Sequence, residues 1–120
     1  MKYSVGMTVT IFLNQGDRTC TIVEVHDQYA LGIYVMPAGG AFLVRIMDDG
    51  RQSRPTAKEV SRFARARTEA MIDYSYERED AADTMRSGWK KRLKLKEILE
   101  HRASLEAALK MLDEPNPVTS

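Results

Sequence analysis

The sequence has little of what marks a secreted or a membrane protein. Its only cysteine, Cys20, excludes an internal disulfide and makes a reducing cytoplasm the simplest compartment. The longest uncharged apolar stretch, residues 29–44, is interrupted by the turn-forming sequence PAGG, and no stretch approaches the ~18 apolar residues of a membrane span. The amino terminus, MKYSVGMTV, lacks the apolar core of a secretion signal. We therefore expect a cytoplasmic protein without a membrane partner.

An excess of charge of one sign is lacking as well. The formal net charge is +1, far from the strongly basic balance of dedicated nucleic-acid binders. Hydrophobic residues make up 43% of the chain and charged residues 29%, which is the composition of a globular rather than a disordered protein. The length of 120 residues fits one domain, or a small domain with an appendage.

Residues that could carry catalysis or hold a metal ion are few. His26 and His101 have no second histidine or cysteine at the spacing of metal ligands. Cys20 lies in an apolar strand pattern, which favours a buried thiol over a nucleophile. The PAGG turn lacks the Gly-Lys-Ser/Thr ending of a phosphate-binding loop. The carboxylates of residues 77–83 follow one helix without the spacing of a calcium loop. The sequence predicts a protein that is not an enzyme and needs no cofactor.

The first half of the chain alternates between apolar and polar side chains with the period of β-strands. Four such runs, at residues 8–13, 18–25, 29–36 and 41–47, are separated by segments rich in Gly, Asn and Asp, which form tight turns. In residues 18–25 the apolar side chains fall on both faces, so we expect a bulge or a two-sided strand there. Four or five short antiparallel strands predict a small barrel.

The opposite face of these predicted strands is not polar either. A sheet face in water does not normally carry many large apolar groups, so another part of the chain should cover it. The second half of the chain is the simplest cover. The apolar residues predicted to lie on this covered face are Phe12, Tyr34, Met36, Leu43 and Met47.

The second half of the chain changes to helical spacing. The sequence TAKE, which begins at Thr56, is a capping-box pattern in which Glu59 reaches back to the start of the helix. Gly88, the only glycine after Gly50, predicts the break between two helices. Two prolines near the carboxyl terminus end the regular structure. The second helix carries an apolar seam whose members are spaced by three, four or seven residues: Leu95, Ile98, Leu105, Leu109 and Leu112.

The first half of the chain also resembles a known family. The segments VGMTV (5–9) and LVRIMDDGRQSRPTAKEV (43–60) are similar to parts of SH3-like small β-barrels of the Tudor or KOW type, and the resemblance covers residues 3–63. It implies a module that binds nucleic acid, peptides or polymerase subunits. It also implies a single helical turn at 56–60 and a closing strand at 61–63. The alternative, a long helix that begins at Thr56, stays open.

These patterns together predict an α+β fold, a small antiparallel SH3-like β-barrel followed by a two-helix hairpin. We expect the barrel-like domain at residues 1–55, the helical hairpin at residues 56–114 and a flexible tail at residues 115–120. No internal repeat is found in the sequence.

Basic side chains gather after the predicted helix break. Residues 86–96 carry six basic side chains and no acidic one, around the only tryptophan of the chain. Cations at the start of a helix oppose its dipole by ~0.3–1 kcal/mol each, and these spread around most of the helix circumference. This arrangement favours a negatively charged partner. The candidate binding residues are Arg86, Trp89, Lys90, Lys91, Arg92, Lys94 and Lys96.

The acidic residues of the chain offer an internal explanation for the same basic run. Residues 69–83 carry six acidic side chains and one basic side chain, so a hairpin folded at Gly88 would place acids opposite bases. Each exposed pair contributes only ~0–1 kcal/mol, so the pairing would fix register more than stability. The expected neighbours are Lys94 and Lys96 with Asp80 and Asp83, and Arg62 and Arg65 with Asp113 and Glu114.

Three functions remain open on this basis. The first is a non-catalytic regulator or inhibitor that docks on a larger protein machine, of the compact kind that bacteriophages and bacteria use. The second is a nucleic-acid-binding accessory protein that uses residues 86–96, with Trp89 stacking on a base. The third is a structural homodimer that covers the leucine-rich seam with a second copy. The identity of the partner does not follow from the sequence.

Overall fold

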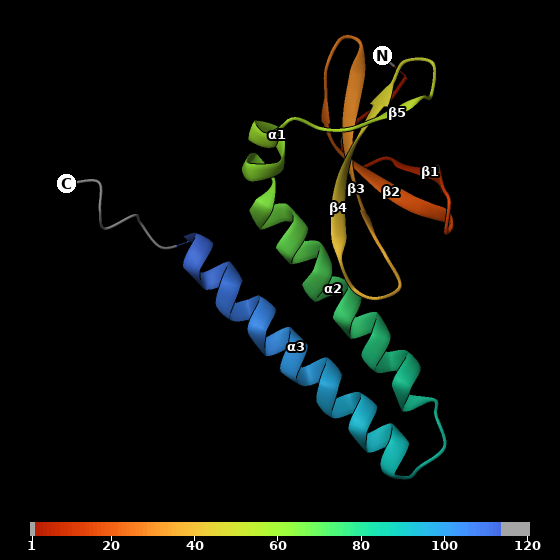
Figure 1. Cartoon of the computed structure of the whole chain (residues 1–120), viewed down its shortest axis with the longest axis vertical. Helices are drawn as coiled ribbons and strands as arrows, with labels where there is room; N and C mark the ends of the chain where they lie inside the picture. Colours follow the sequence, from red (N-terminus) through yellow and green to blue (C-terminus); the bar gives the residue numbers. More distant parts are fainter. Residues whose placement is uncertain (1, 114–120) are drawn as a thin grey trace, which may run out of the picture.

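The computed structural model describes residues 2–113 (Figure 1). Five strands form one antiparallel sheet in the order β1-β2-β3-β4-β5, and the sheet curls into half a barrel before the helices follow. The predicted α+β fold class, a small barrel-like sheet followed by a helical hairpin, is confirmed. The predicted tail, residues 115–120, lies outside the described residues. The elements are β1 (Thr8–Leu13), β2 (Gly16–Val25), β3 (Tyr29–Val35), β4 (Ala41–Met47), β5 (Gln52–Ser53), α1 (Ala57–Arg62), α2 (Ala64–Asp83) and α3 (Trp89–Asp113).

The strands lie close to where the alternating pattern predicts them. The register of β2 against β3 shifts between Ile22 and Glu24, which is the bulge expected from apolar residues on both faces of β2. The sheet face that is turned away from the helices holds its own core. The buried members of this core are Ile11, Cys20, Ile22, Ala30, Val44 and Ile46.

The other face of the sheet packs against the helices. Leu31, Ile33 and Leu43 are buried there, and Phe63 and Met71 from the helical half of the chain pack against them. The expectation that the second half of the chain covers a sheet face is therefore confirmed. The burial of this face explains why both faces of the strands are apolar.

Two residues predicted for the covered face lie elsewhere. Tyr34 packs against the core on the opposite face, and Phe12 is 68% exposed, while the two methionines of the predicted set are half-buried. Phe12 lies in β1, whereas α2 packs on β3 and β4. For Tyr34 the error arises in β3, which is apolar on both faces, so alternation does not show which face turns toward the helices. Close packing decides this instead, because a Cβ atom at Gly32 would lie 2.2 Å from the Sγ atom of Cys20. Only a glycine fits there, and Leu31 turns toward the helices.

The helical half begins at the predicted capping box. The backbone N–H of Glu59 donates to Thr56 Oγ1 at 3.2 Å, and the Thr56 N–H donates to Glu59 Oε1 at 2.9 Å. The chain then leaves the helix at Phe63, whose φ of −101° and ψ of 18° separate α1 from α2. The closing strand expected at residues 61–63 is therefore wrong. The helix that begins after Thr56 is also interrupted, because α1 ends at Arg62 and α2 begins at Ala64, and Phe63 between them packs against the sheet core.

Glu59 also fastens α1 to the sheet. Its carboxylate accepts from Arg45 Nε at 3.0 Å and Nη2 at 3.2 Å, and from the Tyr29 hydroxyl at 3.2 Å. Burial by itself raises the pKa of Glu59, but the hydrogen bond from the Thr56 backbone and the Arg45 guanidinium outweigh it and hold the pKa at about 2. The guanidinium of Arg45 lies 3.9 Å from the centre of the Tyr29 ring, which completes this cluster.

The last helix, α3, runs antiparallel to α2 on the side of α2 that faces away from the sheet (Figure 1). Ile98 and Leu105 of the predicted seam are buried within the single chain, at 1% and 8% exposure. Leu95 and Leu109 are half-buried, and Leu112 is 49% exposed. Most residues of the seam are therefore already covered within the single chain.

Candidate functional site

The hairpin turns at a point far from the sheet (Figure 1). At the end of α2 the hydroxyl of Thr84 donates to the carbonyl oxygen of Ala81 at 2.7 Å. Gly88 follows with a φ of +153°, which residues with a side chain rarely adopt, and α3 begins at the next residue. The predicted break at Gly88 is therefore confirmed. We call residues 85–96 the hairpin tip.

The hairpin tip exposes an apolar cluster. Met85 is 40% exposed, Trp89 64% and Leu93 47%. Trp89 and Leu93 are four residues apart and share one side of α3, and a hollow of about 270 Å³ lies between Met85 and Trp89. Met85 and Leu93 were not among the predicted site residues, although the spacing of Leu93 from Trp89 was a signal. Exposed apolar groups of this size at the end of a hairpin make this surface a candidate interaction site.

Basic side chains surround this apolar cluster. The Nζ atom of Lys90 lies 5.7 Å from the centre of the Trp89 ring, within reach of a cation–π interaction. Lys91 is half-buried, and its Nζ donates to the carbonyl oxygen of Asp83 at 3.0 Å, where it complements the carboxyl end of α2. The other basic candidates, Arg86, Arg92, Lys94 and Lys96, are exposed.

The charge pairing expected for the tip is not the pairing observed. Within residues 2–113 neither Lys94 nor Lys96 pairs with a carboxylate of α2, and Lys96 instead lies 3.9 Å from Glu100 of its own helix. Lys91 precedes Ile98 by two helical turns and so faces α2, whereas Lys96, two residues before Ile98, points to the opposite side of α3. Lys94 precedes Ile98 by four residues and shares its side of α3, but its side chain is exposed. The expected pairing of these lysines with Asp80 and Asp83 is not formed.

Two further arginines were expected to approach the end of α3. Arg62 pairs instead with Glu24 of the sheet at 2.6 Å. Arg65 pairs with Glu69 at 2.8 Å, one turn along the same helix. Of the predicted partners, Glu114 and the side chain of Asp113 lie outside the described residues.

A second polar contact between the two long helices, buried in the middle of the hairpin, is that of Arg102 with Ser75 and Glu79. Its Nη2 atom donates to the carbonyl oxygen of Ser75 at 3.2 Å and to Glu79 Oε1 at 2.5 Å. The sequence contained a signal for this contact, because Arg102 lies four residues after Ile98 and three before Leu105. That spacing places Arg102 on the seam side of α3, facing α2.

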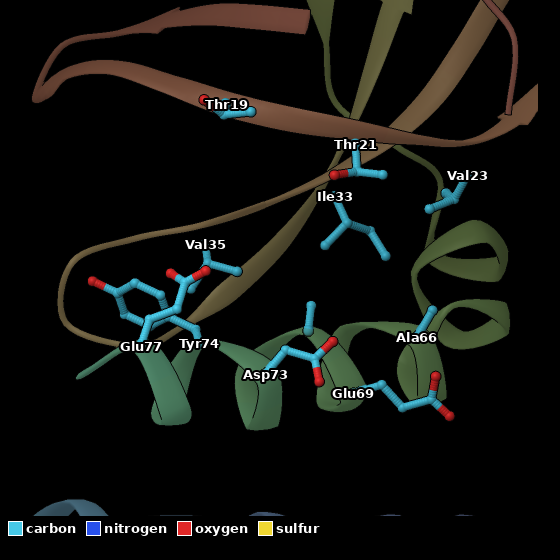
Figure 2. A pocket seen from close by; sticks show the side chains of 11 residues that line it. Thr19, Thr21, Val23, Ile33, Val35, Ala66, Glu69, Asp73, Tyr74 and Glu77 are labelled. Carbon is cyan, nitrogen blue, oxygen red and sulfur yellow. The ribbon is translucent and has the colours of Figure 1, made fainter. Parts of the chain in front are cut away.

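A second hollow lies between the sheet and α2 and has a volume of about 500 Å³ (Figure 2). The sheet lines it with the apolar side chains of Val23, Ile33 and Val35 and with the hydroxyls of Thr19 and Thr21. Figure 2 shows Ile33 projecting from the sheet toward α2. The volume is within the about 300–1,000 Å³ of typical ligand pockets.

Helix α2 gives this hollow an acidic wall. Glu69, Asp73 and Glu77 are spaced by four residues, so they lie on one side of α2. Glu69 is paired with Arg65, whereas the structure gives Asp73 and Glu77 no ion-pair partner among residues 2–113. We call this hollow the acidic groove. It combines an apolar floor with unneutralised carboxylates, and it was not predicted, because it depends on how the curled sheet lies over α2.

Other kinds of site find no support in the part of the chain that the structure describes. Burial raises the pKa of the Cys20 thiol to about 12, which leaves it protonated and unreactive at neutral pH. In residues 2–113 no three His, Cys, Asp or Glu side chains are grouped so as to hold a metal ion. None of the helices described has both the length and the apolar character needed to span a bilayer.

The structure thus offers two surfaces of opposite charge, the basic hairpin tip and the acidic groove. Each combines apolar side chains with charged ones. Comparison with protein-family models, with curated proteins and with solved structures found no match to this chain.

Proposed function

We propose that the protein is a non-catalytic binding protein, a regulator or inhibitor that docks its hairpin tip on a larger protein partner. The observation that carries this proposal is the exposure of Trp89, 64%, at the far end of a projecting hairpin. Met85 and Leu93 extend the apolar surface around it, and basic side chains form the rim. An apolar centre with tryptophan and a charged rim is the anatomy of protein-binding hot spots.

The chemistry of the tip defines the surface that it fits. Trp89 and Leu93 require an apolar recess, and the surrounding bases require carboxylates at the edge of that recess. Opposite charges steer the encounter and reject like-charged surfaces, while the buried indole contributes most of the affinity. The partner surface in this proposal is therefore an acidic protein surface around an apolar recess.

In this proposal the sheet serves as a scaffold of the Tudor or KOW type in the cytoplasm. The strand order supports the scaffold, and so does the side-chain amide of Gln52 in β5, which donates to the carbonyl oxygen of Phe12 in β1 at 3.1 Å. Gly6, in the segment VGMTV, has a φ of +91°, which suits a tight turn before β1. The cytoplasmic location is supported by the single buried thiol of Cys20.

The proposal is tested by reversing charge at the tip. Lys90→Glu with Arg92→Glu should abolish capture of a protein partner from a nuclease-treated bacterial lysate. A matched control, Arg54→Glu with Lys58→Glu, makes the same charge change on exposed side chains outside the tip and should leave capture intact. Equal capture by wild type and tip variant would reject the tip as the docking surface.

Nucleic-acid binding is the second candidate, and one observation favours it. The tip presents five exposed basic side chains together with an exposed indole that could stack on a base. A partner that the wild-type protein loses when the lysate is treated with nuclease would support this candidate over the first.

A further inference from the structure

The acidic groove of this chain has the chemistry that the hairpin tip requires of a partner. Its floor contains Val23 and Val35, which are half-buried and could receive an indole and the aliphatic stems of lysine side chains. Its wall contains Asp73 and Glu77, which are placed to meet basic side chains. An apolar recess with an acidic edge is therefore present on the same molecule as Trp89.

The charges on these two surfaces are unsatisfied in the single chain. Within residues 2–113, neither Arg86 nor Arg92 has a carboxylate partner, and neither do Asp73 and Glu77. All four side chains are exposed, so none must be uncovered before it can pair. Docking a tip in a groove would place the basic side chains of the tip next to the carboxylates of the groove. The contact would exclude part of the water, and the attraction between opposite charges is stronger there than in bulk water.

The tip of a molecule does not reach its own groove. Asp73 and Asp83 belong to the same unbroken helix, which separates them by about 15 Å at ~1.5 Å per residue. The tip begins beyond Asp83 and folds back along α3, which lies on the side of α2 away from the sheet (Figure 1). A tip that docks in the groove must therefore come from another molecule.

We propose that two copies of this chain form a two-fold symmetric dimer in which each tip docks in the acidic groove of the other. Such a contact is reciprocal, so it closes at two copies and does not grow into a fibre. Asp80, which is exposed and follows Asp73 by two turns, continues the acidic surface from the groove toward the tip. The inference rests on the proposed function, because it uses the tip as a docking surface and names a second copy as its partner.

The test uses two charge-reversed forms of the full chain. The tip-reversed form carries Lys90→Glu and Arg92→Glu, and the groove-reversed form carries Asp73→Lys and Glu77→Lys. Light scattering coupled to size-exclusion chromatography, at micromolar concentration, should give wild type twice the mass of one chain, 13.6 kDa. Each reversed form alone should be monomeric, because both of its reciprocal contacts become repulsive. An equimolar mixture should regain the dimer, because both contacts in the mixed pair are attractive.

The controls separate this contact from other causes of dimerisation. Circular dichroism should show unchanged helix content in both reversed forms, since all four positions are exposed. Arg54→Glu with Lys58→Glu should remain dimeric. A monomeric wild type, reversed forms that remain dimeric, or a mixture that stays monomeric would each overturn the inference.

Failure of this inference is distinct from failure of the proposed function. If wild type is monomeric but the tip-reversed form loses a protein partner from the lysate, the dimer is rejected and the docking role of the tip stands. If the mixture restores the dimer but no other protein depends on the tip for capture, the dimer stands and the regulator proposal fails.

Discussion

Arg102 of α3 donates from its Nε atom to the hydroxyl oxygen of Ser75 in α2 at 2.8 Å, in the interior of the hairpin. Both residues are buried, at 8% and 2% exposure, and the guanidinium lies 3.7 Å from the centre of the Tyr76 ring. A planar guanidinium needs its acceptors at fixed directions, so only one alignment of α3 on α2 satisfies it. We infer that this contact fixes the register of the hairpin and, through it, the position of Trp89.

Removing this guanidinium should destabilise the hairpin. Arg102→Ala leaves the half-buried carboxylate of Glu79 without its partner, so the free energy of unfolding should fall by roughly 2–4 kcal/mol. Urea denaturation followed by circular dichroism measures this loss. Lys94→Ala, on an exposed side chain of the same helix, should change stability by less than about 0.5 kcal/mol. Equal effects of the two substitutions would contradict a special role for Arg102.

The close approach of β3 to β2 makes a second prediction. A Cβ atom at Gly32 would lie 2.2 Å from Cys20 Sγ, and the thiol is fully buried, so Gly32→Ala should lower stability by roughly 1–3 kcal/mol. In a background that carries Cys20→Ala, the same substitution should cost less, because the clashing atom is gone. A double-mutant cycle by thermal denaturation measures the coupling, and strictly additive losses would show that this contact is not the cause.

Glu59 predicts a specific loss of stability in acid. Its folded pKa of about 2 is lower than the ordinary value of 4.5, so the folded chain binds this proton less readily than the unfolded chain. The contribution is complete above pH 4.5 and disappears as the pH falls toward 2. At about 1.4 kcal/mol per pKa unit it amounts to roughly 3 kcal/mol.

The measurement is the free energy of unfolding as a function of pH. Glu59→Gln should lower stability at neutral pH and flatten the decline between pH 4.5 and 2. Glu106→Gln, which removes an exposed carboxylate from α3, should leave the decline unchanged. A decline in Glu59→Gln as steep as that of wild type would assign the acid sensitivity to other groups.

The packing of the sheet on the helices predicts the behaviour of a truncated chain. A fragment that ends at Pro55 would expose Leu31, Ile33 and Leu43, which the helices bury in the intact protein. We expect this fragment to aggregate, as measured by light scattering of the purified fragment. A soluble, monomeric fragment that unfolds cooperatively would contradict this account of the covered face.

The nucleic-acid alternative predicts how the binding affinity should depend on salt concentration. If the tip binds phosphates, each basic residue lost should reduce the slope of log affinity against log salt by ~0.9 for duplex DNA. Under the protein-binding proposal we expect Lys90→Glu with Arg92→Glu to leave this slope nearly unchanged. Fluorescence anisotropy with a labelled duplex measures the slope. A reduction of the slope by ~0.9 for each basic residue lost would favour the alternative.

The parts of the fold that depend on local patterns could be predicted from the sequence. Alternation placed the strands, and apolar residues on both faces of residues 18–25 predicted the bulge after Ile22. The Thr56 capping box and the glycine at position 88 predicted where the helical half begins and turns. Each of these features is decided by residues that are close together in the chain.

The remaining features depend on contacts between distant segments. The close packing of Gly32 on Cys20 decides which face of β3 turns toward the helices. The alternation of apolar and polar residues contains no information about this contact. The helix break at Phe63 coincides with its packing against the sheet, a contact between distant segments that the helical spacing does not contain. The acidic groove arises between β2 and α2, so Asp73 and Glu77 read in sequence as a solvated helix face. In the candidate site, the exposure of Trp89 also depends on how α3 packs against α2.

The central claim, that the hairpin tip is the docking surface, is tested most directly at Trp89. It is the only tryptophan of the chain, so protein labelled with fluorotryptophan should give a fluorine NMR signal from the tip alone. The account predicts that this signal shifts or broadens when the captured protein partner is added, and that it stays unchanged when the chain carries Lys90→Glu with Arg92→Glu. An unchanged signal from wild-type protein that has bound its partner would place the docking surface elsewhere and contradict the account.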